Sequence, residues 1–168
     1  ESAHPYHDWN KRITAECYRP NTAARILDKQ GRIIDIINNY SRMSFDFGPT
    51  LLSWMERNDP ETYRAVIQSD IESRNRFSGH GSAMAQCYNH MIMPLAVPED
   101  KKTQVIWGIK DFVYRYGRHP DGMWLPETAV DLATLDLLAK EEIKFSILAP
   151  HQAKAIRRLE GGDWLDTS

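Results

Sequence analysis

The carboxylate of Glu127 stands directly after a short apolar run that also carries the indole of Trp124. Pro126 comes just before Glu127, and because proline has no N–H to donate, an interior strand is expected to end at Leu125. Glu127 is therefore predicted to lie at the carboxyl tip of a strand. A carboxylate placed there can attack the anomeric carbon of a sugar, and a neighbouring aromatic ring can stack on the sugar's apolar face.

The segments around Glu127 predict a β–α–β unit. Residues 102–116 carry apolar side chains at helical spacing, and residues 118–122 break that helix as a turn. After Glu127, Thr128 can cap a helix that runs to about Ile143, and 145–149 is expected to be the next strand. Strands connected in this way are parallel, and ligands bind at the carboxyl ends of parallel strands.

Earlier segments predict further elements of both kinds, so the expected fold class is α/β. Helices are expected over 21–30, 51–56 and 60–77, and strands over 43–47 and 79–86. The segment 32–39 fits either a helix or a strand, with the helix favoured. Asp46, His90 and Glu127 all fall near expected strand ends, which predicts a single cleft.

Composition limits the partners that this chain can have. A formal net charge of -2 gives no reason to expect nucleic acid or an anionic membrane as partner. No apolar run approaches the roughly 20 residues of a membrane-spanning helix. The two cysteines are too few for a disulfide framework and lack metal-ligand spacing, so reduced thiols and a cytoplasmic location are expected. The length of 168 residues permits one domain with a real core.

Three motifs resemble segments of family 57 glycoside hydrolases. Residues 122–127, Gly-Met-Trp-Leu-Pro-Glu, resemble the segment that carries the catalytic nucleophile of that family. Residues 88–95 resemble the Thr-His-x-x-Leu-Pro-Leu element of its branching-enzyme-like members, with His90 at the histidine position. Residues 13–18 resemble an Ile-Thr-Glu-Thr-Tyr stretch, which brings in Glu16. The chain also resembles an uncharacterised branch of this family whose members carry an attached domain of unknown function.

The resemblance implies a retaining glycoside hydrolase or glucanotransferase that acts on α-glucans through a covalent glycosyl-enzyme intermediate. Glu127 would be its nucleophile, and no cofactor would be needed. The implied fold is an irregular (β/α) barrel of the glycoside hydrolase and deacetylase type. Members begin with a strand bearing a His-x-His-x-x-Pro type element, and their general acid is a downstream aspartate; neither is found in residues 1–168. The chain is therefore expected to be a single-domain fragment of a larger barrel, inactive without the rest of the parent polypeptide.

The remaining site candidates each have a structural alternative. His90 or His80 could donate a hydrogen bond that keeps Glu127 ionised. His90 could instead be a satisfied core histidine between Tyr88 and Met91. Trp124 could stack on a sugar or pack in the core. Glu16 could line the site or pair with Arg12 or Arg19, and Asp46 could face a cleft or solvent. Glu127 itself could occupy the first turn of the next helix, where acidic residues favour the positive end of the helix dipole.

Two other function classes stay open. A metal-dependent polysaccharide deacetylase would need an aspartate and two histidines around a divalent cation, and Asp46, His80 and His90 form the plausible trio. The third class is a carbohydrate-binding domain that has the same barrel fold but no catalytic activity.

Overall fold

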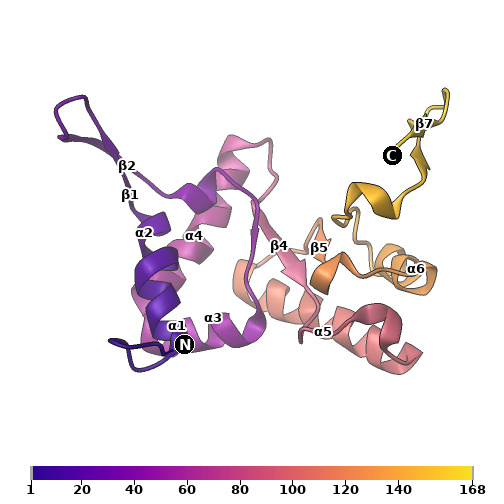
Figure 1. Cartoon of the computed structure of the whole chain (residues 1–168), viewed down its shortest axis with the longest axis horizontal. Coiled ribbons are helices and arrows are strands. Elements are labelled where there is room, and N and C mark those ends of the chain that lie inside the picture. The colour runs from indigo at the N-terminus through magenta and orange to yellow at the C-terminus, as the bar shows by residue number, and fades with distance from the viewer. Residues whose placement is uncertain (1, 168) are drawn as a thin grey trace.

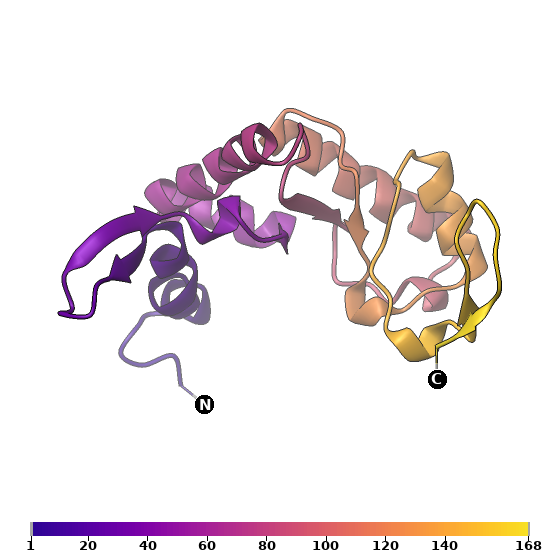
Figure 2. The ribbon, with the colours of Figure 1, turned by 90° about the horizontal axis from the view of Figure 1, so that it is seen from above.

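The computed structural model describes residues 2–167, which form a mixed α/β arrangement drawn out into an arc (Figures 1 and 2). The helices are α1 Trp9–Ile13, α2 Arg19–Thr22, α3 Pro49–Asn58, α4 Pro60–Arg76, α5 Pro98–Tyr116 and α6 Leu132–Lys140. The strands are β1 Ala24–Leu27, β2 Ile33–Ile37, β3 Phe45–Asp46, β4 Ala83–Gln86, β5 Met123–Trp124, β6 Ala155–Ile156 and β7 Leu165–Asp166. Shorter helical turns are a π-turn at Thr14–Tyr18 and 3-10 turns at Asn39–Ser41, Met93–Leu95, Pro126–Thr128 and Pro150–Gln152.

A parallel sheet of order β3-β4-β5 lies at the centre of the chain. Asp46 pairs with Met84, and Gln86 pairs with Trp124. A further parallel bridge joins Gly122 to Phe145. Helices α3 and α4 connect β3 to β4, α5 connects β4 to β5, and α6 leads to Phe145. The connecting helix and the parallel direction of the predicted β–α–β unit are therefore confirmed, although its second strand is reduced to the bridge at Phe145.

The hydrophobic core lies between one face of this sheet and the helices. Alternate strand residues Phe45, Ala83, Ala85, Cys87, Met123 and Leu125 belong to one buried cluster with Val105, Ile109 and Phe112 of α5. Because side chains alternate along a strand, Asp46, Gln86 and Trp124 lie on the opposite face. Helix α5 approaches β4 so closely that a Cβ atom at Gly108 would lie 2.1 Å from the Gln86 carbonyl oxygen.

The expected helix over 21–30, and the helix favoured over 32–39, are both wrong. These residues form the antiparallel hairpin β1–β2, which projects from the body in Figure 1. The Asp28 carboxylate accepts hydrogen bonds from the N–H groups of Gln30 and Arg32, both at 2.9 Å, and Gly31 adopts a φ of 78°. This turn chemistry, together with the β-branched isoleucines of β2, outweighs the local helix signal.

The element after Glu127 also differs from the expectation. Thr128 has a φ of 54°, outside the helical region, and α6 begins at Leu132 with Asp131 as its N-cap. The Asp131 carboxylate accepts the Thr134 N–H at 2.8 Å, which is the usual capping bond. The expected strand 145–149 is reduced to the bridge at Phe145, and residues 146–149 have no strand partner among the described residues.

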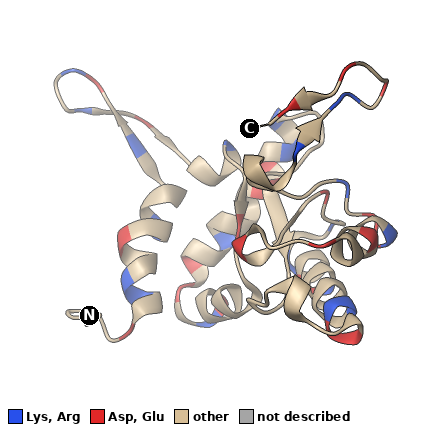
Figure 3. Cartoon of the chain, turned by 45° about the vertical axis from the view of Figure 1, so that its right-hand side comes forward, with Lys and Arg blue, Asp and Glu red and all other residues tan. Residues whose placement is uncertain are grey.

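The other expected elements are present with shifted ends. The helix of 102–116 begins earlier, at Pro98, and the helices of 51–56 and 60–77 are α3 and α4. The strands of 43–47 and 79–86 shorten to β3 and β4. Among residues 2–167, no helix is both long enough and apolar enough to cross a membrane. Figure 3 shows acidic and basic residues interspersed along the elements rather than gathered on one of them.

An ion-pair network lies at the amino ends of the sheet strands. The Arg118 guanidinium donates to both Asp70 oxygens, at 2.8 and 2.7 Å, and to the Ala83 carbonyl oxygen at 2.8 Å. Asp70 is 1 % exposed and also accepts the Ala83 N–H at 3.0 Å. A Cβ atom at Gly81 would collide with both charged groups. The network joins α4, the segment after α5 and the start of β4, so it fixes the sheet end opposite to Glu127.

Candidate active site

Glu127 lies on a strained turn just beyond the carboxyl end of β5. Leu125 is fully buried, and Pro126 then leads into Glu127 with φ 57° and ψ 20° and Thr128 with φ 54°. Two successive left-handed residues other than glycine cost about 1–3 kcal/mol each, and such strain concentrates at functional sites. The Thr128 N–H donates to the Leu125 carbonyl oxygen at 2.9 Å. The position of Glu127 just after the strand is the one that the sequence predicted. Its side chain is 68 % exposed, so the turn presents the carboxylate to solvent.

His90 reaches Glu127 from the loop after β4, the strand next to β5. Its Nε2 atom lies 2.8 Å from Glu127 Oε1. A carboxylate can only accept, so His90 donates from Nε2 when Glu127 is ionised. A nucleophile needs the ionised carboxylate, and in that state Glu127 accepts this hydrogen bond. The sequence offered His90 or His80 as the donor to Glu127, and the structure brings His90 into contact.

Gln104 of α5 holds the loop that carries His90. Its carboxamide oxygen accepts the Asn89 N–H at 2.7 Å, and its carbonyl oxygen accepts the Tyr88 N–H at 3.2 Å. Gln104 is only 6 % exposed, so these bonds form away from competing water. Sequence reasoning missed this residue. The sequence gives one indication of its role: Gln104 is a polar residue at a position that the apolar periodicity of the helix places on the buried face.

Gln152 holds the other side of the site. Its Nε2 donates to the Thr128 carbonyl oxygen at 2.7 Å, and its Oε1 accepts the Ala149 N–H at 2.7 Å. No sequence motif marked this residue, because its partners are backbone groups brought near by the fold. Two segments therefore contact the Glu127 turn: the earlier segment that carries His90 and the later segment that carries Gln152.

Asp46 and Trp124 share the face of the sheet that turns away from the helices. Asp46 is the last residue of β3 and is half-buried, and this burial raises the pKa of its carboxyl. Trp124 is also half-buried and pairs in register with Gln86 of the strand between them. The Gln86 carboxamide lies over Gly48, where an added Cβ would come within 3.2 Å of its nitrogen. Asp46, Gln86 and Trp124 are thus polar or aromatic groups near the carboxyl ends of three adjacent strands.

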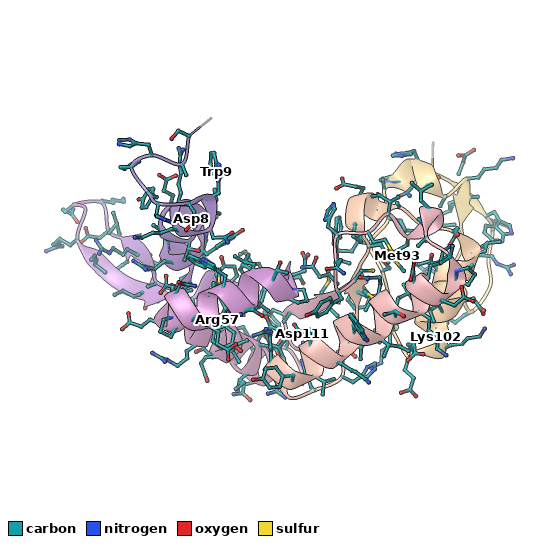
Figure 4. All side chains as sticks on the ribbon, turned by 90° about the horizontal axis from the view of Figure 1, so that it is seen from below. Asp8, Trp9, Arg57, Met93, Lys102 and Asp111 are labelled. Carbon is teal, nitrogen blue, oxygen red and sulfur yellow. The ribbon has the colours of Figure 1, made fainter. Side chains whose placement is uncertain are left out.

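Glu16 and His80 lie away from Glu127. Glu16 Oε2 accepts from Arg12 Nε at 3.2 Å, one of the surface pairs expected as its structural alternative. In Figure 4 the neighbouring Asp8 and Trp9 mark one end of the arc, whereas Met93, just after the His90 loop, lies toward the other. His80 precedes β4, and its Nδ1 lies 3.6 Å from Asp121 Oδ2 at the amino ends of the strands.

The trio considered for a metal ion is not assembled. His80 lies before β4 and His90 after it, so the strand separates the two imidazoles. Within residues 2–167, no group of three or more His, Cys, Asp or Glu side chains has the geometry of a metal site. Both cysteines are free, and burial raises the pKa of the Cys87 thiol to about 11.

Comparisons with known proteins place the chain in a family. The solved structure of a 4-alpha-glucanotransferase from Thermococcus litoralis is similar in fold, with a TM-score of 0.54 and 22 % identity. The similarity covers 72 % of this chain but only 19 % of that enzyme. A search of curated proteins gave no significant match. The sequence profile of glycosyl hydrolase family 57 matches residues 4–156, which confirms the resemblance seen in the motifs. The chain belongs to glycosyl hydrolase family 57.

Proposed function

We propose that this chain carries the nucleophile of a retaining glycoside hydrolase or glucanotransferase that acts on α-glucans, and that Glu127 is that nucleophile. The observation that carries the proposal is the 2.8 Å contact between His90 and Glu127, which joins two motifs 37 positions apart. Both residues follow adjacent parallel strands, at the edge where such sheets bind ligands. Family membership and the glucanotransferase fold neighbour support the same chemistry.

The contact assigns different tasks to the two oxygens of Glu127. Oε1 accepts the His90 hydrogen bond, which leaves Oε2 to attack the anomeric carbon. The new carbon–oxygen bond forms as the glycosidic bond breaks, and the leaving oxygen takes a proton from a general acid. Water or a sugar hydroxyl then gives its proton back to the deprotonated acid and displaces Glu127 from the anomeric carbon. Water gives hydrolysis and a sugar hydroxyl gives transfer, with the same residues.

We propose that the chain forms one part of a larger irregular (β/α) barrel. Its parallel segments β3, β4, β5 and Phe145 are too few to close a barrel. The share of the glucanotransferase that the chain spans, 19 %, fits a part of this kind. The general acid, an aspartate by family resemblance, would then come from outside this chain, and the isolated chain would be inactive.

We propose that Asp46 and Trp124 bind the same glucan that Glu127 attacks. Trp124 lies three residues before Glu127, on the sheet face without helices, and its half-exposed ring can stack on a sugar. Asp46 is half-buried, has no ion-pair partner among residues 2–167, and accepts a hydrogen bond from its own backbone N–H. A sugar hydroxyl could donate a further hydrogen bond to its carboxylate. The contacts of Glu16 and His80 favour structural roles for these two residues.

The proposal is tested by comparing the full-length wild type with Glu127→Gln on soluble starch, glycogen and maltooligosaccharides. Glutamine keeps the shape but cannot form the glycosyl-enzyme, so kcat should fall by about four orders of magnitude or more. Glu142→Gln is the matched control, because Glu142 is also an exposed glutamate with a left-handed backbone, at φ 61°. Undiminished activity in Glu127→Gln would refute the assignment, and glucan binding without turnover in the wild type would favour a carbohydrate-binding domain.

A further inference from the structure

Gln152 joins the turn of Glu127 to the segment that follows the last paired residue of the sheet. In the Gln152 side chain only the carboxamide oxygen can accept the Ala149 N–H. The amide nitrogen therefore faces the Thr128 carbonyl oxygen, at 2.7 Å. The side chain therefore bridges positions 24 residues apart in sequence. Gln152 also donates its own N–H to the Ala149 carbonyl oxygen at 3.0 Å, which fixes it in a tight turn.

The turn of Glu127 needs such an external bond. Its backbone is left-handed at both Glu127 and Thr128, a conformation that residues with a Cβ disfavour. The turn's own hydrogen bonds are local: Thr128 N–H to Leu125, Ala129 N–H to Pro126, and the Thr128 hydroxyl to the Glu127 carbonyl oxygen. Among residues 2–167, Gln152 provides the hydrogen bond that reaches this backbone from another segment.

We propose that Gln152 is a positioning residue, which holds the Glu127–Thr128 turn in its left-handed form and so aims the Glu127 carboxylate at the anomeric carbon. This inference rests on the proposed function for its catalytic consequence, but not for the tether itself. Reacting atoms must be aligned within about 3–3.5 Å, and a small misplacement costs up to about 100-fold in rate. Release of the tether therefore lowers kcat more than it weakens glucan binding.

Two substitutions separate the tether from the local turn. Gln152→Ala removes both side-chain hydrogen bonds. Gln152→Glu keeps an acceptor for Ala149 but replaces the donor to Thr128 by an oxygen. The matched control is Gln68→Ala, because Gln68 is an exposed glutamine on α4, remote in sequence from the turn.

The measurement uses the full-length protein and has two readouts. In both Gln152 variants kcat on glucan should fall by about tenfold or more with KM within about twofold, while Gln68→Ala keeps the wild-type values. Backbone hydrogen exchange in the peptide over 125–130 should accelerate in both variants, because the Thr128 and Ala129 amides lose protection as the turn opens. Thermal unfolding should stay at the wild-type temperature.

Wild-type kcat and exchange in Gln152→Glu would overturn the inference, because only the Ala149 bond would then matter. A wild type without turnover on any glucan would refute the proposed function instead. The exchange readout still decides the tether in that case: faster exchange over 125–130 supports it, and unchanged exchange overturns it.

Discussion

His90 Nε2 and Glu127 Oε1 lie 2.8 Å apart, although 37 positions separate the two residues in sequence. The contact exists because β4 and β5 are neighbours in a parallel sheet and each residue follows the carboxyl end of its strand. Gln104 fixes the loop before His90, and Gln152 contacts the turn of Glu127. The candidate site is thus an exposed pair whose two backbone segments are bonded to glutamine side chains of α5 and of the turn Pro150–Gln152.

Removal of the His90 imidazole should reduce activity with little effect on stability. Once a bound glucan excludes water from the pair, a hydrogen bond to a charged group contributes about 1.5–3 kcal/mol, so His90→Ala should lower kcat by about 10- to 100-fold. Both side chains are more than 60 % exposed, at 66 % and 68 %, so the pair adds little to folding. Steady-state kinetics and Tm of the full-length protein check this, with His7→Ala as the exposed-histidine control. Wild-type kcat in His90→Ala would remove His90 from the site.

Loss of the Arg118 side chain should destabilise the fold. Asp70 is 1 % exposed, and Arg118→Ala would leave its carboxylate buried without the paired guanidinium. Breaking a buried pair from one side costs about 3–5 kcal/mol. Arg118→Lys should rescue only part of this, because lysine cannot donate the two parallel bonds. Urea unfolding measures the loss, with the exposed Arg64→Ala of α4 as control; equal stabilities of the two alanine variants would contradict the account.

Gly108→Ala should be far more harmful than an ordinary glycine substitution. The new Cβ would lie 2.1 Å from the Gln86 carbonyl oxygen, which is backbone and cannot turn aside. We expect a loss of about 3 kcal/mol or more, since overpacking usually costs about 1–3 kcal/mol even where side chains can adjust. Gly31→Ala is the comparison, because nothing lies within 4 Å and only its φ of 78° resists the change. A smaller loss at Gly108 than at Gly31 would show that α5 can move away from β4.

Asp131 should make stability depend on acid pH. Hydrogen bonds from Lys101 and Thr134 lower the pKa of its carboxyl to about 2, below the ordinary value of 3.8. A carboxyl whose folded pKa is depressed stabilises the fold above the unfolded pKa, and this stabilisation is lost as pH falls toward the folded pKa. Asp131→Asn should therefore be less stable than wild type at pH 6, by on the order of 1 kcal/mol after allowance for solvent screening. The difference should shrink between about pH 4 and pH 2 in urea titrations. A difference that is constant with pH would contradict the pairing.

The sequence predicts those helices and strands whose apolar residues recur with a clear helical or strand spacing. It fails to predict the elements that depend on contacts between distant segments. The apolar spacing of α5 and the proline after Leu125 predict the helix, the strand end and the position of Glu127. The hairpin β1–β2 escapes prediction because its isoleucines are exposed on both faces, so no strand alternation appears. Threonine is a residue type that often caps helices, but the N-cap of α6 is Asp131 and not Thr128. The Asp131 carboxylate also pairs with Lys101.

Within the site, the His90 contact follows from motifs, whereas the supporting glutamines do not. Gln104 and Gln152 bond to backbone groups of Asn89, Thr128 and Ala149, and backbone groups leave no mark in a sequence. Only the folded positions of α5 and of the segment after Phe145 bring these partners together.

The most direct test of the central claim is to trap the covalent intermediate on the full-length protein. A fluorinated glucosyl fluoride that reacts quickly but is released slowly should label the nucleophile of a retaining enzyme. Peptide mass spectrometry should then find one added sugar on the peptide that contains Glu127, and none in Glu127→Gln. Turnover of glucan with the label on another carboxylate, or with no label at all, would contradict the assignment of Glu127.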